Sequence, residues 1–142
     1  FPVAEAIEFK LEYFFPGYYL DVRDSNEMEG DEGRAIPQYN TIQLRLDVYE
    51  GMWQGEPRPR FTAAHEIGHF LIHRNVAMPR SSENFPIYRD AEWQADTFAG
   101  ALMMPRGHIG KFRDVADAAE VCGISFHAAS LMWQKYENKG FI

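Results

Sequence analysis

The sequence predicts an α+β fold that is rich in helix and carries a small sheet in its first half. Apolar residues recur at helical spacing near the start and through most of the second half, whereas residues 41–49 alternate apolar and polar side chains. A period of two is typical of a half-buried strand, and a period near 3.6 is typical of an amphipathic helix. We expect helices at 3–15, 61–73 and 90–104, a helical pair after residue 111, and strands at 18–22, 35–38 and 41–49.

Proline and glycine mark the ends of these elements. Pro16 and Gly17 follow the first helix, and Pro105 follows the helix at 90–104. Proline cannot continue a helix or donate to a sheet ladder, so residues 51–59 and 75–89 are expected to be loops. Thr62 is a candidate N-cap for the helix at 61–73, which would place His65 in its first turn.

The composition indicates a globular chain. Of the 142 residues, 46% are hydrophobic, which is too many for a disordered protein, and the formal net charge of −7 argues against non-specific nucleic-acid binding. We predict one domain over residues 1–142, with a core at 1–105 and a helical segment at 106–142. The single cysteine, Cys122, excludes an internal disulfide and a zinc site built from two or four cysteines.

The sequence contains no apolar run near the roughly 20 residues that a membrane-spanning helix needs. No secretory signal peptide is visible, and the chain begins at Phe1, so a leader or a further domain could precede it. The lone cysteine fits a cytoplasmic protein, which is the location that we expect.

The clearest functional signal is the segment His-Glu-Ile-Gly-His at residues 65–69. In a helix, residues four apart lie on one face, about 6 Å apart along the axis. Two imidazoles so placed can bind one tetrahedral zinc ion, and the intervening glutamate can act as a base. We therefore predict His65 and His69 as metal ligands and Glu66 as the catalytic base. The alternative is a pair of exposed histidines beside an acid.

A third ligand is expected from the helix at 90–104. Catalytic zinc sites usually take three protein ligands. Glu92 and Asp96 lie one turn apart on one face of an alanine-rich helix that can approach another helix closely, and either carboxylate could bind the metal. Glu92 reaches further, so we predict it as the ligand. Asp96 would then accept a hydrogen bond from a ligand imidazole, which we expect to be His65.

His73 is the competing candidate for the third ligand. In an unbroken helix it lies about 12 Å along the axis from His65, and no glycine separates it from His69. Metalloproteases that use a third histidine place a helix-breaking glycine before it. We therefore expect His73 to have a capping or structural role, and His108 and His127 to be ordinary helix or loop histidines.

These segments resemble the ImmA/IrrE family of zinc metallopeptidases. Members carry an RFT-AHELGH-like block, followed by an E-x-A-N/D-x-FA block that ends in Leu-Met-Pro. Here residues 60–73 match the first block and residues 92–105 match the second, which ends in Leu-Met-Met-Pro. The resemblance extends over most of the chain, and residues 61–105 are its specific part. Asp96 stands where many members have asparagine.

The resemblance implies a zincin-like metallopeptidase core with a small antiparallel sheet. It implies a gluzincin-like site in which His65, His69 and Glu92 hold one Zn²⁺ per chain. It also implies a cytoplasmic protein, typically from a bacterium or a phage. Members commonly cleave or antagonise a helix-turn-helix repressor, so a DNA-binding repressor is the implied protein substrate.

The segment at 106–142 has the spacing of a helix-turn-helix. Gly123 suits a helix C-terminus, and Ser125 can cap the helix that follows. The start of that second helix, Phe-His-Ala at residues 126–128, lacks the Arg, Asn or Gln that base reading favours. We expect a docking or structural helical pair and no direct DNA binding.

The predicted function is therefore hydrolysis of a peptide bond by zinc-activated water, with Glu66 as general base. No residue stands out as the oxyanion stabiliser, and Tyr88, His73 and Arg89 are candidates. Three alternatives stay open. The domain could hold zinc and grip a repressor with little turnover, it could belong to a toxin–antitoxin pair, or the native metal could be manganese or iron.

Overall fold

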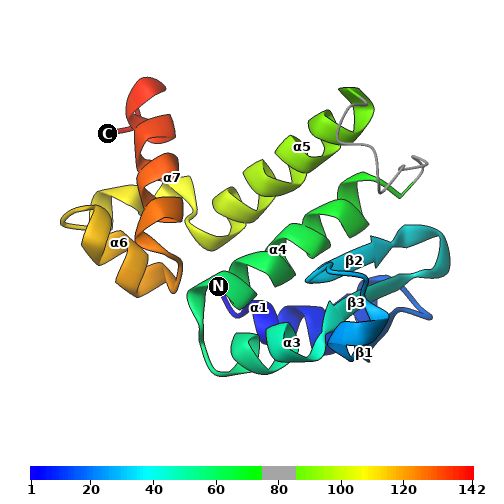
Figure 1. Cartoon of the computed structure of the whole chain (residues 1–142). Coiled ribbons are helices and arrows are strands. Elements are labelled where there is room, and N and C mark those ends of the chain that lie inside the picture. Colours follow the sequence, from blue (N-terminus) through cyan, green and yellow to red (C-terminus); the bar gives the residue numbers. More distant parts are fainter. Residues whose placement is uncertain (75–85) are drawn as a thin grey trace.

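In the computed structural model, the helix α4 (Pro57–Ile72) lies between a three-stranded sheet and a second long helix, α5 (Pro86–Met103) (Figure 1). The structure describes residues 1–74 and 86–142, and side chains from Arg89 onward in α5. The predicted α+β class is confirmed. Most of the predicted loop at 75–89 lies outside the described residues, although its last four residues belong to α5.

The first predicted helix, at 3–15, is present over residues 3–14, and its first part packs against α4. It runs as α1 (Val3–Glu5), a π-helical stretch η1 (Ala6–Lys10) and α2 (Leu11–Phe14). Val3, Ile7 and Leu11 are buried, whereas Phe14 is exposed. The Tyr18 hydroxyl donates to the Ile7 carbonyl over 2.6 Å, which ties the middle of this helix to the residue before the first strand.

The sheet is mixed, not antiparallel, and this corrects the expectation from the family resemblance. Its order is β1-β3-β2; β1 is parallel to β3, with Tyr19 opposite Thr41, and β2 is antiparallel to β3, with Gly33 opposite Leu44. A tight turn at η3 (Pro37–Tyr39) forces β2 and β3 into a hairpin, while the longer connection through η2 (Ser25–Glu27) lets β2 pass to the far side of β3. The strands are β1 (Tyr19–Arg23), β2 (Gly33–Ile36) and β3 (Thr41–Arg45).

The predicted strand at 41–49 is four residues too long. It ends at Arg45, and α3 (Leu46–Trp53) follows, so the predicted loop at 51–59 begins in a helix. Val48 and Met52 are both buried. Their spacing of four residues puts them on one face of a helix, so Val48 fits the helical period as well as the strand period.

The metal-motif helix begins four residues earlier than predicted. Pro57 is the first residue of α4, a position at which the backbone N–H that proline lacks has no partner within the helix. His65 therefore lies well inside the helix, and Thr62 is not its N-cap. A glycine then allows α5 to approach closely: a Cβ atom on Gly68 would lie 3.3 Å from the Cα atom of Ala95 and 3.0 Å from the ring of Phe98. This confirms the expectation from the alanine-rich face of α5.

The C-terminal segment forms the predicted helical pair. After a 3-10 stretch, η4 (Arg106–Lys111), come α6 (Val115–Cys122) and α7 (Phe126–Asn138). Both predicted caps are confirmed, because Gly123 ends α6 with a φ of 65° and the Ser125 hydroxyl accepts from the Ala128 N–H. The Tyr136 hydroxyl donates to the Met104 carbonyl over 2.7 Å and ties α7 to the end of α5.

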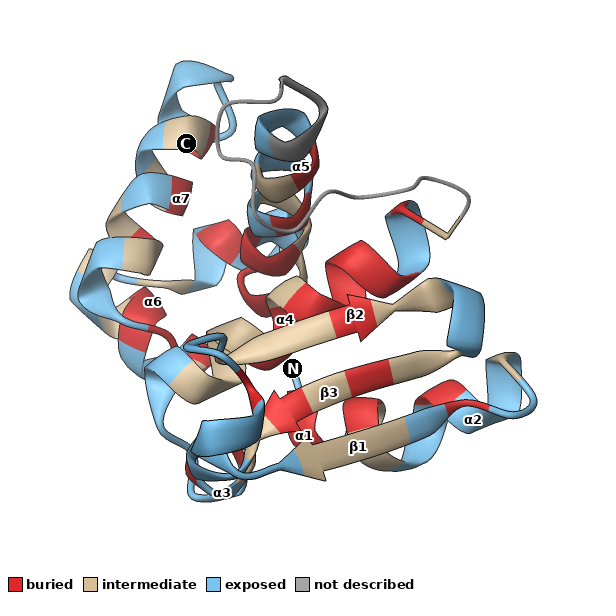
Figure 2. Cartoon of the chain, turned by 45° about the vertical axis from the view of Figure 1, so that its right-hand side comes forward, coloured by how far each residue is buried: buried red, intermediate tan, exposed pale blue. Residues whose placement is uncertain are grey.

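Buried residues are concentrated on α4 and recur along β2 and β3 (Figure 2). Phe70, Ile42, Leu44 and Met103 are fully buried and hold α4 between the sheet and α5. The core therefore fixes α4, the helix that carries both candidate histidine ligands. Within the described residues, no helix has the length and apolar character that crossing a membrane requires.

Candidate metal centre

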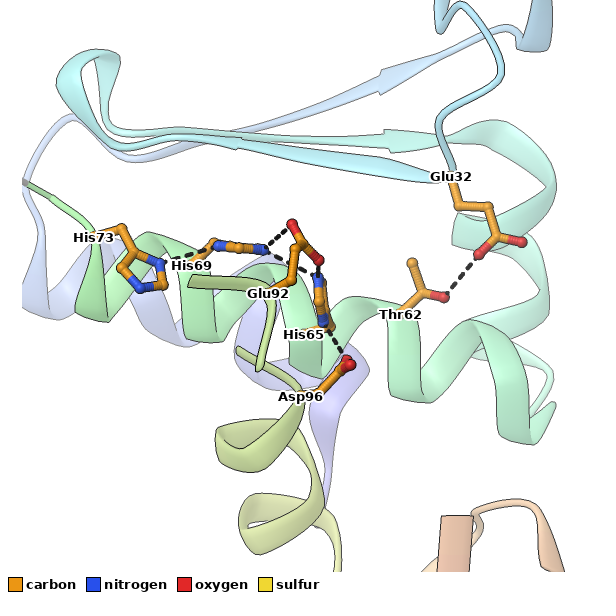
Figure 3. Close-up of polar contacts among 7 residues, drawn as sticks. All are labelled: Glu32, Thr62, His65, His69, His73, Glu92 and Asp96. Atoms are coloured by element: carbon orange, nitrogen blue, oxygen red, sulfur yellow. Dashed lines mark hydrogen bonds and ion pairs between the residues drawn. The ribbon is translucent and has the colours of Figure 1, made fainter. Parts of the chain in front are cut away.

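Three predicted ligands converge between α4 and α5 (Figure 3). His65 Nε2 lies 3.0 Å from His69 Nε2. The Glu92 carboxylate lies between them, with Oε2 3.0 Å from His65 Nε2 and Oε1 2.9 Å from His69 Nε2. Among the described residues, these three form the group that could hold a metal ion.

The donor set fits zinc. Two ligands that each lie about 2.1 Å from a tetrahedral zinc ion are about 3.4 Å apart. The ligand atoms here are closer together by about 0.4 Å, which a small rotation of the side chains would correct. Two imidazoles and one carboxylate leave a fourth position open, as catalytic zinc sites do.

Asp96 lies behind His65, where the sequence predicted it. Its Oδ1 atom is 2.7 Å from His65 Nδ1, on the side of the ring away from Glu92. Accepting the Nδ1 hydrogen leaves Nε2 directed at the candidate metal position. Its role in supporting a ligand stays a prediction, because the structure gives the contact and not the metal.

The histidine pair and Glu92 form a strongly polar cluster. Burial lowers the pKa of His65, but its hydrogen bonds to Asp96 and Glu92 and the charge of Glu66 outweigh burial and raise the pKa to about 10. Burial raises the pKa of Glu92, but its hydrogen bonds to His65 and His69 prevail and hold the pKa far below its usual range. The raised pKa favours a proton on His65, and any metal ion that binds at this position must displace it.

Glu66 is buried and lines the same cleft as the ligands. Its charge is one of the causes that raise the pKa of His65, so its carboxylate lies within electrostatic range of that ligand. The opposite wall is β2: a Cβ atom on Gly33 would lie 2.8 Å from Glu66 Cγ and 3.2 Å from Leu44 Cδ2. Gly33 therefore leaves the space that the Glu66 side chain occupies.

His73 does not join the three ligands. It caps the C-terminus of α4 and is buried, which agrees with the predicted capping role. Its Nδ1 atom lies 3.0 Å from His69 Nδ1 and its Nε2 atom 2.8 Å from Gln94 Oε1. With both ring nitrogens engaged, His73 does not fit the oxyanion role. Arg89 is exposed, and the Tyr88 side chain lies outside the described residues.

A cleft of about 1150 Å³ runs along α4 beneath β2 and contains all three candidate ligands. At one end, Glu32 accepts a hydrogen bond from the Thr62 hydroxyl (Figure 3). It accepts a second hydrogen bond from Arg58. Ile36 and Arg74 line the cleft as well. A cleft of this volume and polar lining can take a stretch of polypeptide across the candidate metal position.

Sequence reasoning missed Gln94, Gly33 and Glu32. Gln94 is in the matched second block, but nothing in the sequence indicates that it meets His73. Glu32 falls in the acidic stretch at 27–33, which reads as a solvated loop. Each of these residues acquires its place only when β2 and α5 pack against α4.

A helix with His-Glu-x-x-His that faces a glutamate from a neighbouring helix is typical of metallopeptidases. A family model described as the IrrE N-terminal-like domain, peptidase M78, matches residues 23–133, and the chain belongs to this family. The match confirms the resemblance to the ImmA/IrrE proteins. The comparisons found no significant match among curated proteins or among solved structures.

Proposed function

We propose that the protein is a zinc-dependent peptidase in which His65, His69 and Glu92 hold the metal and Glu66 is the general base. The observation that carries this proposal is the convergence of the three ligand side chains in one cleft, with Glu66 buried beside them. The family match supports a metallopeptidase.

Zinc, when bound, supplies a Lewis acid that makes water nucleophilic near neutral pH and polarises a carbonyl group. Glu66 takes the proton of the attacking water and passes it to the leaving amine. Asp96 keeps His65 oriented, and the cleft along α4 aligns the substrate backbone. The substrate that the family resemblance favours is a DNA-binding repressor of the helix-turn-helix type, cleaved in the cytoplasm.

The test is a digest of a library of unstructured peptides by the zinc-loaded protein, with new chain ends identified by mass spectrometry. Wild type should generate ends that Glu66→Gln does not. A helix-turn-helix repressor encoded beside this gene is then incubated with both proteins. Cleavage that persists fully in Glu66→Gln would contradict the assigned base.

The second candidate function is antagonism of a repressor by binding alone. The observation that favours it is the apolar surface of the C-terminal pair, where Val121, Phe126 and Leu131 are each more than half exposed. Under this alternative, Glu66→Gln would release the repressor from DNA as well as wild type does, and no peptide would be cut. An electrophoretic mobility assay with both proteins separates the two functions.

A further inference from the structure

A chain of hydrogen bonds leads from the candidate metal position through His69 and His73 to Gln94. His69 Nδ1 lies 3.0 Å from His73 Nδ1, and His73 Nε2 lies 2.8 Å from Gln94 Oε1. His69 and His73 are one helical turn apart and both buried, and Gln94 reaches His73 from α5. Figure 3 shows His73 on the side of His69 away from Glu92.

The end of this chain sets its direction. In the amide orientation seen here, the Gln94 carbonyl oxygen accepts the hydrogen of His73 Nε2, and His73 Nδ1 is left with a lone pair. That lone pair accepts a hydrogen from His69 Nδ1. His69 Nε2, which faces Glu92 Oε1 at 2.9 Å, is then the ring nitrogen that gives up its hydrogen when a cation binds. A donor in place of the Gln94 oxygen would reverse both bonds and put a hydrogen on the ligand nitrogen.

We propose that His73 and Gln94 are positioning residues that fix the tautomer of His69 and thereby raise the affinity of the centre for zinc. This inference rests on the proposed function, since it takes His69 as a zinc ligand. Under this proposal, the Nδ1 atoms of His65 and His69 have different hydrogen-bond partners. The Asp96 carboxylate holds His65 directly, whereas an amide oxygen holds His69 through a second imidazole.

The difference has a geometric reason. The contact with His69 Nδ1 comes from one turn further along the same helix, where a buried imidazole also ends α4. An imidazole can relay a hydrogen bond because it accepts at one nitrogen and donates at the other. Through His73, the Gln94 side chain on α5 therefore influences which nitrogen of the His69 ring carries the hydrogen.

The test measures the zinc dissociation constant by chelator competition, starting from metal-free protein. Gln94→Met keeps the length of the side chain and removes the acceptor, and Gln94→Glu keeps an acceptor. We expect affinity to fall about 10- to 100-fold in Gln94→Met and in His73→Phe, and to stay within a few fold of wild type in Gln94→Glu. Gln134→Met, at an exposed glutamine of α7, is the matched control and should bind as wild type does.

A second readout separates positioning from packing. Long-range proton–nitrogen correlation spectra of ¹⁵N-histidine protein report which ring nitrogen carries the hydrogen. In wild type and Gln94→Glu, His69 should carry it on Nδ1, and in Gln94→Met this preference should weaken without a change in melting temperature. Equal zinc affinity and an unchanged tautomer in Gln94→Met would overturn the relay alone. Failure of wild type to take up zinc would overturn the relay and the proposed function together.

Discussion

The helix pair around the candidate metal centre and the C-terminal helix pair are held together by different chemistry. α4 and α5 make a close apolar contact where Gly68 faces Ala95. Along the cleft they also meet through polar side chains that pair with one another, His65 with Glu92 and Asp96, and His73 with Gln94. α6 and α7 meet through small apolar residues, among them Ala119, Cys122 and Ala129, and their ends are capped.

This contrast separates activity from stability. Buried polar groups cost free energy unless each has a partner, so a cluster like that between α4 and α5 is a poor way to stabilise a fold. Capped helices that pack through apolar side chains stabilise the fold, but they supply no groups for catalysis or metal binding. We therefore expect substitutions in the cleft to change catalysis or metal binding, and substitutions in the C-terminal pair to change the free energy of unfolding.

The largest effect should come from Glu66→Gln. Loss of a general base typically lowers the rate about 10²- to 10⁴-fold, and the amide keeps the shape of the side chain. Peptide cleavage followed by mass spectrometry should fall by this amount, with zinc content and melting temperature unchanged. Glu12→Gln, at an exposed acid of α2, is the control. If Glu66→Gln lost zinc or unfolded, the separation of the two regions would break down.

The next effect is a pH dependence of the metal-free protein. The pKa of His65 is about 10 in the folded chain and about 6.5 when unfolded. Because the raised pKa favours the protonated folded state, this contribution is complete below pH 6.5 and is lost as the pH rises toward 10.

Urea unfolding in the presence of a chelator should therefore give a higher midpoint at pH 6 than at pH 9. His65→Gln removes the titrating group and should reduce that difference. A midpoint that rises from pH 6 to pH 9 in wild type would contradict the polar pairing of His65 with Glu92 and Asp96.

A smaller effect is expected at the wall of the cleft. A Cβ atom on Gly33 would lie 2.8 Å from Glu66 Cγ, so Gly33→Ala must displace the Glu66 side chain or β2. We expect kcat/KM to fall about tenfold, the equivalent of about 1.4 kcal/mol, with zinc still bound. Gly107→Ala, where a Cβ atom meets nothing within 4 Å, is the matched control. Unchanged cleavage in Gly33→Ala would show that Glu66 does not need this space.

The smallest effect should come from the C-terminal pair. Tyr136→Phe leaves the Met104 carbonyl without its 2.7 Å hydrogen bond and should lower the free energy of unfolding by about 1 to 2 kcal/mol. Urea denaturation measures this loss, and Tyr39→Phe, at an exposed tyrosine, should show none. A change in zinc affinity in Tyr136→Phe would mean that the two helix pairs are coupled.

The sequence predicted the parts of the site that follow from spacing along one helix. His65 and His69 share a face because they are four residues apart, and the longer side chain of Glu92 favours it over Asp96 as the third ligand. The structure brings these residues together in the predicted arrangement, with Asp96 against His65. Their roles at a metal stay predictions.

The features that were missed depend on contacts between elements distant in sequence. Gln94 meets His73 only because α5 crosses α4 at Gly68, and Gly33 meets Glu66 only because β2 is the strand beside α4. The direction of β1 depends on the path of the chain between β1 and β2, which alternation does not specify. The predicted strand at 41–49 extends beyond the end of β3 at Arg45, because Val48 fits the period of a strand as well as that of a helix.

The most direct test of the central claim is the metal content of protein purified without added metal, measured by plasma mass spectrometry. Wild type should hold about one zinc ion per chain, and His69→Ala and Glu92→Ala should each hold almost none while keeping a folded circular dichroism spectrum. A wild-type protein that carries no metal and takes up none on titration would contradict the claim that His65, His69 and Glu92 form a zinc site.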